Sequence, residues 1–178
     1  MYAVGDKVVY PHHGAGKILK IAPKEVLGRR REYLTIQILH SRMVAMVPVE
    51  SADRAGLRKV VAADVTEQVI GVLRDEASAM PKGWSHRYKH NRDKLKTGDI
   101  FEVAEVVRNL ARLNACKGLS TGEKQMFTKA KRILASELMY ARDLTEDAAA
   151  ALVESVLAVV RVDAAAPVAG ARRPAPAV

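Results

Sequence analysis

The sequence predicts an α+β protein of two domains, a small β-barrel followed by an all-α helical bundle. Up to about Val61, apolar residues alternate in short runs that end at Pro or Gly, which is typical of strands. From Asp64 onward they recur with the 3.6-residue period of amphipathic helices. We therefore expect a β domain at residues 1–62 and a helical domain at 63–162. An Ala/Pro-rich tail at 163–178 is expected to be disordered.

Four strands account for the β domain, and a small barrel is favoured because closure removes exposed edges. A charged segment, residues 23–32, reads as a hairpin tip between two of them. It is either a solvated turn or part of a sheet edge offered to a partner chain. The predicted strands are Val4–Tyr10, Lys17–Ile21, Tyr33–Ile38 and Met43–Val47.

Capping signals divide the second domain into helices. Asp64 or Thr66 precedes a first short helix, and Trp84 opens a second that stops near Gly98. Asp99 is followed three residues later by Glu102, the spacing at which a cap and a reciprocal side chain meet. The sequence from Ser120 to Glu123 is a capping box by residue type and spacing. A last helix is expected over residues 145–160.

Bulk composition points to a polyanionic partner. The chain of 178 residues carries a formal charge of +9 and has a pI of about 9.8. A single cysteine, Cys116, allows neither a disulfide framework nor a Cys-based zinc site. The charge alone fits either a nucleic acid or an anionic membrane. No secretory signal and no membrane-spanning stretch are visible, so we expect a cytoplasmic protein, with no membrane as partner. Nothing in the sequence suggests an obligate dimer, so we expect a monomer.

Enzyme chemistry finds little support. The Gly14-Ala15-Gly16 turn lacks the later glycine and the following helix of a dinucleotide site. Cys116 is expected to be a small packing residue, not a nucleophile. His86 and His90 lie one helical turn apart, but there is no obvious third metal ligand and cations flank both. We therefore expect no catalytic residues, no metal and no cofactor.

The most informative segment is the basic stretch from Lys82 to Lys94, which contains the only tryptophan, Trp84. Helical spacing places three of its polar side chains on one face and three cations on the adjacent face. Aromatic surface beside cations favours a nucleic-acid interface, with cations on phosphates and a ring against bases. The alternatives are a solvated helix surface and a Trp84 that anchors the core, which is about as plausible from the sequence alone. The first face holds Arg87, Asn91 and Lys94, and the second holds Lys89, Arg92 and Lys96.

Three motifs resemble the CarD/CdnL family of bacterial transcription regulators. They are Val-Gly-Asp-Lys-Val-Val-Tyr-Pro-His-His-Gly-Ala-Gly at 4–16, Trp-Ser-His-Arg-Tyr-Lys-His-Asn at 84–91 and Leu-Ser-Thr-Gly-Glu-Lys-Gln-Met at 119–126. The resemblance covers about residues 1–160, in the same order and spacing, and motifs from both halves contribute to it.

The resemblance implies a Tudor-like or SH3-like N-terminal domain that binds the β subunit of RNA polymerase. It implies a helical domain that contacts promoter DNA near the −10 element of the housekeeping holoenzyme, largely without reading sequence. There Trp84 would wedge into the minor groove at the upstream edge of the bubble and stabilise the open complex. Some relatives have Arg where this chain has Lys24 and Met46, so the contact at Met46 is expected to be apolar.

The expected contact residues fall into two sets. The DNA-binding set is Trp84, Arg87, Tyr88, Lys89, Asn91, Arg92, Lys94, Lys124 and Lys131. The polymerase-binding set is Lys24, Tyr33, Val44, Met46 and Pro48. Two other functions remain open: a polymerase-independent architectural DNA-binding protein, and a protein-interaction adaptor with Trp84 in its core.

Overall fold

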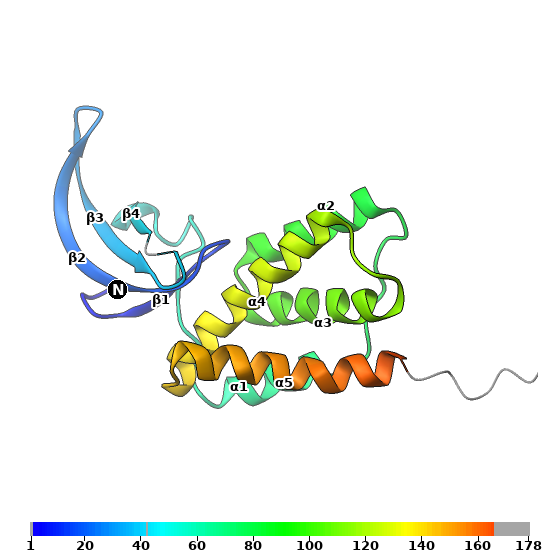
Figure 1. The fold of residues 1–178 in the computed structure, drawn as a ribbon. Coiled ribbons are helices and arrows are strands. Elements are labelled where there is room, and N and C mark those ends of the chain that lie inside the picture. The colour runs from blue at the N-terminus through cyan, green and yellow to red at the C-terminus, as the bar shows by residue number, and fades with distance from the viewer. Residues whose placement is uncertain (1, 42, 166–178) are drawn as a thin grey trace, which may run out of the picture.

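The computed structural model describes residues 2–41 and 43–165, with side chains as far as Val159. An N-terminal antiparallel sheet is followed by a helical domain (Figure 1), which confirms the α+β class and the order of the two parts. The last helix continues to Ala165, three residues into the segment predicted as tail. The rest of that predicted tail, 166–178, lies outside the described residues.

The sheet has five strands in the order β4-β3-β2-β1-β5, with antiparallel pairing throughout. β5 follows a short 3₁₀ turn, η1 (Val49–Ser51), and was not predicted. Within the described residues β4 and β5 do not pair, so hydrogen bonds do not close the curved sheet and both strands are edges. The strands are β1 (Lys7–Tyr10), β2 (Gly14–Val26), β3 (Arg29–Ile38), β4 (Val44–Pro48) and β5 (Arg58–Lys59).

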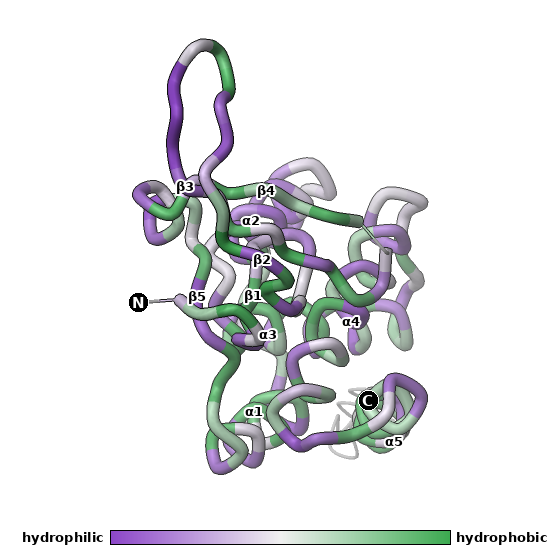
Figure 2. The backbone as a smooth tube through the Cα atoms, turned by 90° about the vertical axis from the view of Figure 1, so that its left-hand side faces the viewer, coloured by the Kyte–Doolittle hydropathy of each residue, from purple (hydrophilic) through white to green (hydrophobic). Residues whose placement is uncertain are grey.

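Two strands are longer than the sequence pattern predicts. The β2–β3 pairing continues through the charged segment as far as Val26 and Arg29. Leu27 and Gly28 make the turn with φ of 51° and 72°, and positive φ at both positions suits the twist of a two-residue hairpin. The alternation of apolar residues fades here because both faces of the projecting hairpin meet solvent. Figure 2 shows it standing clear of the domain, with hydrophilic arms.

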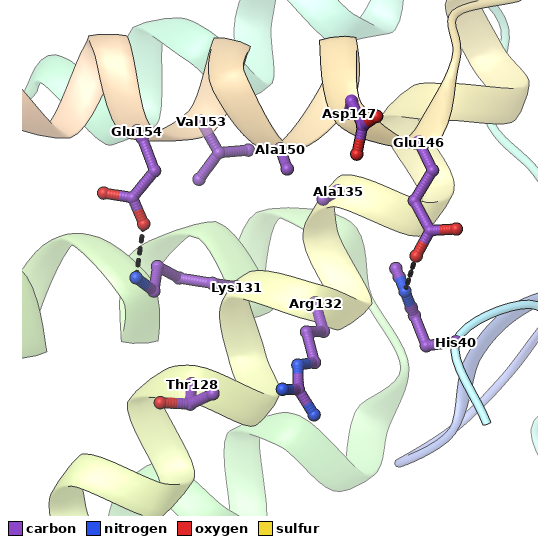
Figure 3. Close-up of a pocket in the computed structure, with 10 residues that line it drawn as sticks. All are labelled: His40, Thr128, Lys131, Arg132, Ala135, Glu146, Asp147, Ala150, Val153 and Glu154. Carbon is purple, nitrogen blue, oxygen red and sulfur yellow. Dashed lines mark hydrogen bonds and ion pairs between the residues drawn. The ribbon is translucent and has the colours of Figure 1, made fainter.

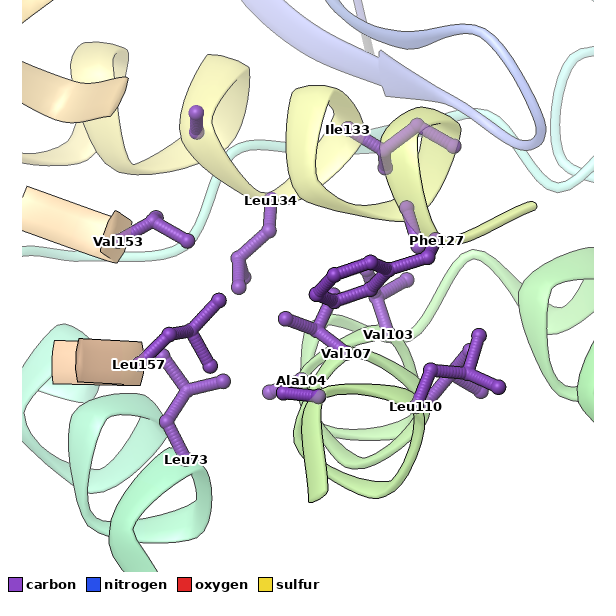
Figure 4. Close-up of a cluster of buried hydrophobic side chains, with 14 of the residues drawn as sticks. Leu73, Val103, Ala104, Val107, Leu110, Phe127, Ile133, Leu134, Val153 and Leu157 are labelled. Atoms are coloured by element: carbon purple, nitrogen blue, oxygen red, sulfur yellow. The ribbon is translucent and has the colours of Figure 1, made fainter. Parts of the chain in front are cut away.

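Each domain has its own core. In the sheet, Leu34, Ile36 and Ile38 of β3 are buried, as their alternation predicts, and pack with Val8, Ile18 and Val47. In the helical domain, Leu110, Leu134, Leu138 and Leu157 are fully buried and come from three different helices. Figure 4 shows Leu110, Leu134 and Leu157 in this core together with Phe127. One core is built from strands and the other from helices, so the spacing of apolar residues along the sequence changes once, where the sheet ends and the helices begin.

Five helices form the second domain, and their termini follow the predicted caps. The Asp99 carboxylate accepts hydrogen bonds from the backbone N–H of Phe101 and Glu102. Ser120 and Glu123 form the predicted capping box. Gly98 ends the second helix in the left-handed conformation, with φ of 72°. The helices are α1 (Val65–Arg74), α2 (Trp84–Thr97), α3 (Ile100–Lys117), α4 (Thr121–Arg142) and α5 (Glu146–Ala165).

The two domains are joined by buried polar contacts as well as by the connecting segment. Arg58 of β5 donates to both carboxylate oxygens of Glu137 on α4, at 2.5 and 2.8 Å, and also to the carbonyl of Gly98. The Ala15 backbone N–H donates to Ser136 Oγ at 2.9 Å. Because Glu137 and Ser136 are about 2% exposed or less, these contacts fix the sheet against α4. We refer to the Arg58–Glu137 and Ala15–Ser136 contacts as the interdomain clamp.

None of the helices in the described part of the chain is both long enough and apolar enough to cross a membrane. Cys116 lies near the end of α3 and is exposed. The expectation that it packs inside the protein is therefore wrong.

Candidate functional site

Trp84 is the first residue of α2, as predicted, and 63% of it is exposed. The preceding Gly83 supplies no side-chain cap. A side chain this exposed contributes little to the core, and the alternative that makes Trp84 a core anchor is therefore wrong. An exposed indole is available to contact a partner.

Arg87 was expected to hold a DNA phosphate, but the structure buries it. Its Nε donates to Glu123 Oε1 at 2.6 Å, and its Nη1 donates to the carbonyls of Lys82 and Pro81 at 3.0 and 3.3 Å. With its side chain 7% exposed, Arg87 is largely withdrawn from solvent. It instead holds the backbone that immediately precedes Trp84.

Asn91 and Lys94 were also expected to contact DNA and do not face solvent. Asn91 is fully buried and donates to Met80 Sδ at 3.7 Å. Lys94 lies between Glu105 and Glu102, at 2.5 and 3.0 Å. Burial alone would lower the pKa of Lys94, but these two carboxylates outweigh it and raise the pKa. Lys94 therefore joins α2 to α3, and Asn91 holds the segment that precedes α2.

A single carboxylate organises the start of two helices. Glu123 Oε2 accepts from the backbone N–H and the hydroxyl of Ser120, at 3.0 and 2.7 Å, while Oε1 accepts from Arg87. Burial alone would raise the pKa of Glu123, but the hydrogen bonds from Arg87 and Ser120 lower it overall. The charged carboxylate thus caps α4 and, through Arg87, fixes the segment that carries Trp84.

The remaining residues of the DNA-binding set divide by exposure. Lys89, Arg92 and Lys124 are exposed. Tyr88 is half-buried, packed against the helical core and near Gly122. Lys131 is bound to Glu154 and lies 4.7 Å from the Phe127 ring, so its charge is already neutralised. The structure therefore leaves Trp84 with three exposed cations from the expected set, and Tyr88 beside them.

The polymerase-binding set lies together on the outer face of the sheet. In the β3–β4 register, Tyr33 is opposite Pro48 and Gln37 is opposite Val44. Val44 and Met46 are 52% and 50% exposed. Lys24 reaches across β3, and its Nζ lies 3.3 Å from Met46 Sδ. The five residues named from the sequence therefore form one continuous surface that includes the edge strand β4.

Sequence reasoning missed one exposed residue of the hairpin. Leu27 is 97% exposed at the turn between β2 and β3. The signal that the sequence offered was an apolar residue directly before Gly28 inside a charged segment. Leu27 was overlooked because the whole segment was predicted as a charged hairpin tip.

The described residues contain no group of three or more His, Cys, Asp or Glu side chains placed to hold a metal ion. His86 and His90 remain neighbours on α2.

The sheet with its exposed edge face, clamped to a helical domain with an exposed indole and exposed cations, defines a two-domain macromolecule-binding protein. Residues 2–61 match the CarD-like/TRCF RID domain family, and residues 68–154 match the CarD C-terminal domain family. The chain belongs to the CarD family, whose members are RNA polymerase-interacting transcription factors and not enzymes.

Two known proteins illustrate the relationship. The chain is 38% identical to the putative transcription factor YdeB of Bacillus subtilis (strain 168) over 146 residues, which cover 82% of this chain and 95% of YdeB. It is 37% identical to the N-terminal domain of Myxococcus xanthus CarD, solved by NMR as a 72-residue fragment. That match has a TM-score of 0.30 and covers 33% of this chain and 79% of the fragment.

Proposed function

We propose that this protein docks on the β subunit of RNA polymerase through the outer face of β2, β3 and β4 and stabilises the promoter open complex with Trp84. The observation that carries the proposal is the position of the indole. It is 63% exposed at the very start of a helix whose other side is fixed by the buried Arg87–Glu123 pair. Because the backbone beside the ring is already fixed, insertion of the ring into a nucleic acid would cost little backbone entropy.

The energetics favour this use of a single ring. When a promoter opens, base pairs at the edge of the bubble lose stacking. A ring placed against an unstacked base regains about 1–3 kcal/mol, which corresponds to a roughly 5- to 150-fold shift in the opening equilibrium. Lys89, Arg92 and Lys124 would hold phosphates beside it and fix the register without reading sequence.

Docking on polymerase makes modest DNA affinity sufficient. A protein tethered next to its DNA site binds it as an intramolecular event, at an effective concentration in the millimolar range for a short connection. Val44 and Met46 supply exposed apolar surface on an edge strand, which suits contact with another sheet. Lys24, Tyr33 and Pro48 complete this contact face.

Trp84→Ala tests the DNA step. We expect the variant to fold normally and bind polymerase, and the half-life of the open complex to fall by about 5- to 150-fold, measured by heparin challenge. Lys89→Ala is the control on the same helix and should cause a smaller loss that depends on salt. An unchanged half-life in the Trp84→Ala complex would overturn the proposed wedge.

Met46→Glu tests the polymerase step. A carboxylate in the apolar part of the contact face should abolish co-purification with the isolated β subunit while leaving DNA binding by the free protein unchanged. Gln37→Glu places a similar charge on the same face, opposite Val44 and two positions along β3 from Thr35, the partner of Met46. Because it lies farther from Met46, it should weaken binding to the β subunit less. If both variants bind β as the wild type does, the docking face lies elsewhere, and a polymerase-independent function becomes the better explanation.

A further inference from the structure

The turn between β1 and β2 lies between two helices of the other domain. A Cβ at Gly98, the end of α2, would lie 3.0 Å from Pro11 Cγ. A Cβ at Gly14 would lie 2.8 Å from Ser136 Oγ of α4. His12 and His13 lie between Pro11 and Gly14 in the sequence. These close approaches therefore place both histidines at the seam where the two domains meet.

Positive charge from both helices surrounds this turn. Burial is the largest cause that lowers the pKa of His12, and the remaining causes are the positive charges of Lys129, His13, Lys96 and Arg92. His13, which stacks on Tyr10, has a lowered pKa through burial and Lys129. Apart from His13 itself, the charged groups that act on these imidazoles come from α2 and α4, and all of them are cationic.

The surface here is hollowed. One hollow is lined by the two imidazoles together with Lys129 and Arg132, and a second hollow on α4 shares the same Lys and Arg. The second hollow also reaches Lys124, a residue of the expected DNA-binding set. The seam is thus connected to the candidate DNA surface along α4.

Two of the three nearby carboxylates already have partners, and the third, Asp147, is exposed on the first turn of α5 and forms no ion pair with Arg132 in the described residues. Glu146 binds His40 at 2.8 Å, and Glu154 binds Lys131. Figure 3 shows Arg132 between these two pairs, directed toward neither of them. Neither Lys129 nor Arg132 forms an ion pair with any residue that the structure describes, so their charge is open to an external anion. Arg92 and Lys96 share one exposed carboxylate, Asp93, at 3.8 and 3.4 Å, and together still carry excess positive charge.

We propose that these six residues form a single phosphate-binding surface for duplex DNA, so that the N-terminal domain contributes directly to DNA binding. We call it the junction surface: His12, His13, Arg92, Lys96, Lys129 and Arg132. It rests on the proposed function, because it extends the DNA path that begins at Trp84. Duplex DNA is the favoured occupant because the surface is cationic on both helices and continues into the candidate DNA surface on α2 and α4.

The length of α2 sets the extent of this path. From Trp84 to Lys96 the helix advances about 18 Å, at about 1.5 Å per residue. A duplex with one charge per 3.4 Å on each strand places about five phosphates of one strand over that distance. The junction surface would therefore hold the duplex about five base pairs from the edge of the bubble, where the DNA is still paired.

The salt dependence of DNA binding tests the proposal. The logarithm of the association constant falls linearly with the logarithm of the salt concentration, and each lost phosphate contact makes this slope shallower by about one. The full-length Lys129→Gln/Arg132→Gln variant is titrated with a 30-base-pair duplex by fluorescence anisotropy at several salt concentrations. We expect its slope to be shallower than that of the wild type by about two units. Its affinity should fall by the same factor on duplexes of unrelated sequence. Arg29→Gln/Arg30→Gln removes two exposed charges from the distant hairpin and should leave the slope unchanged.

A third variant separates failure of this inference from failure of the proposed function. Lys89→Gln removes a cation of the expected DNA-binding set outside the junction surface and should lower the slope by about one. If only the junction variant leaves the slope unchanged, the junction surface is wrong and the DNA path near Trp84 stands. If neither variant changes the slope, DNA binding by this domain is itself wrong. A reduced slope in the hairpin variant as well would show that the effect follows net charge and would also overturn the junction surface.

Discussion

The two sides of α2 carry cations that look alike in the sequence and behave differently in the structure. On one side, Arg87 and Lys94 are fixed by carboxylates of α4 and α3. On the other side, Lys89 and Arg92 face solvent. The inner cations determine where the helix lies, and the outer ones are exposed to solvent. A basic helix thus has a structural face and an exposed face, and the count of charges does not separate them.

The largest expected difference between the two faces is the loss of stability in Arg87→Ala compared with that in Lys89→Ala. Removing Arg87 leaves the Glu123 carboxylate buried without its charged partner, which costs about 3–5 kcal/mol. Removing Lys89 should change the free energy of unfolding by at most about 0.5 kcal/mol. Urea denaturation followed by circular dichroism measures both. Equal stabilities would show that the two faces do not differ as described.

The interdomain clamp extends the comparison to the other domain. Glu137→Ala removes the buried carboxylate that receives both arms of Arg58 and should cost about 3 kcal/mol. Because the lost contacts join the two cores, we expect the single unfolding transition to separate into two in differential scanning calorimetry. Glu146→Ala, which removes the exposed pairing with His40, is the matched control and should keep one transition.

Acid titration tests the charge state of the inner face. The pKa of Glu123 is below its ordinary value of 4.5, so its stabilising effect is complete above about pH 4.5 and is lost as pH falls through the lowered pKa. Glu123→Gln should be less stable than the wild type by about 1.5–3 kcal/mol near neutral pH. This difference should shrink as the pH falls below 4.5. A difference that is independent of pH would show that packing, not charge, accounts for the role of Glu123.

The smallest expected effect concerns the seam between the domains. The pKa of His12 is lowered by burial and by Lys129, His13, Lys96 and Arg92, so the unfolded chain takes up a proton at a higher pH than the folded one. Stability is therefore fully present above the ordinary pKa of 6.5 and decreases as pH falls below it.

His12→Asn, which tolerates the left-handed backbone at φ of 67°, should make stability less dependent on pH between 6.5 and 5. Thermal melts at half-unit pH intervals measure this. A wild-type protein that gains stability as the pH falls through this range would contradict the lowered pKa of His12.

Much of the fold was predictable because its signals are local. The change from a period of two to 3.6, the Asp99 cap and the Ser120–Glu123 capping box each depend on neighbouring residues. The extended β2–β3 hairpin and the short β5 were missed because pairing there follows from the partner strand and not from alternation of apolar residues.

The exposed face of α2 was only partly predictable, because it depends on packing between helices. Helical spacing placed Arg87 and Asn91 together, but not on the inner side. Leu95 offered the missing signal, since it is the only aliphatic residue of α2 and follows Asn91 by one turn and Arg87 by two. A lone leucine in a basic helix marks the side that meets the core.

The interdomain clamp has a thermodynamic consequence for how the protein meets its partners. Two domains joined by a flexible linker must lose orientational freedom each time they engage a composite surface, and that loss weakens binding. In this protein Arg58, Ser136 and Glu137 settle the relative orientation during folding. The proposed contact face on the sheet and the indole on α2 are therefore presented at a fixed spacing, and binding to both proposed partners would not require the two domains to lose further orientational freedom.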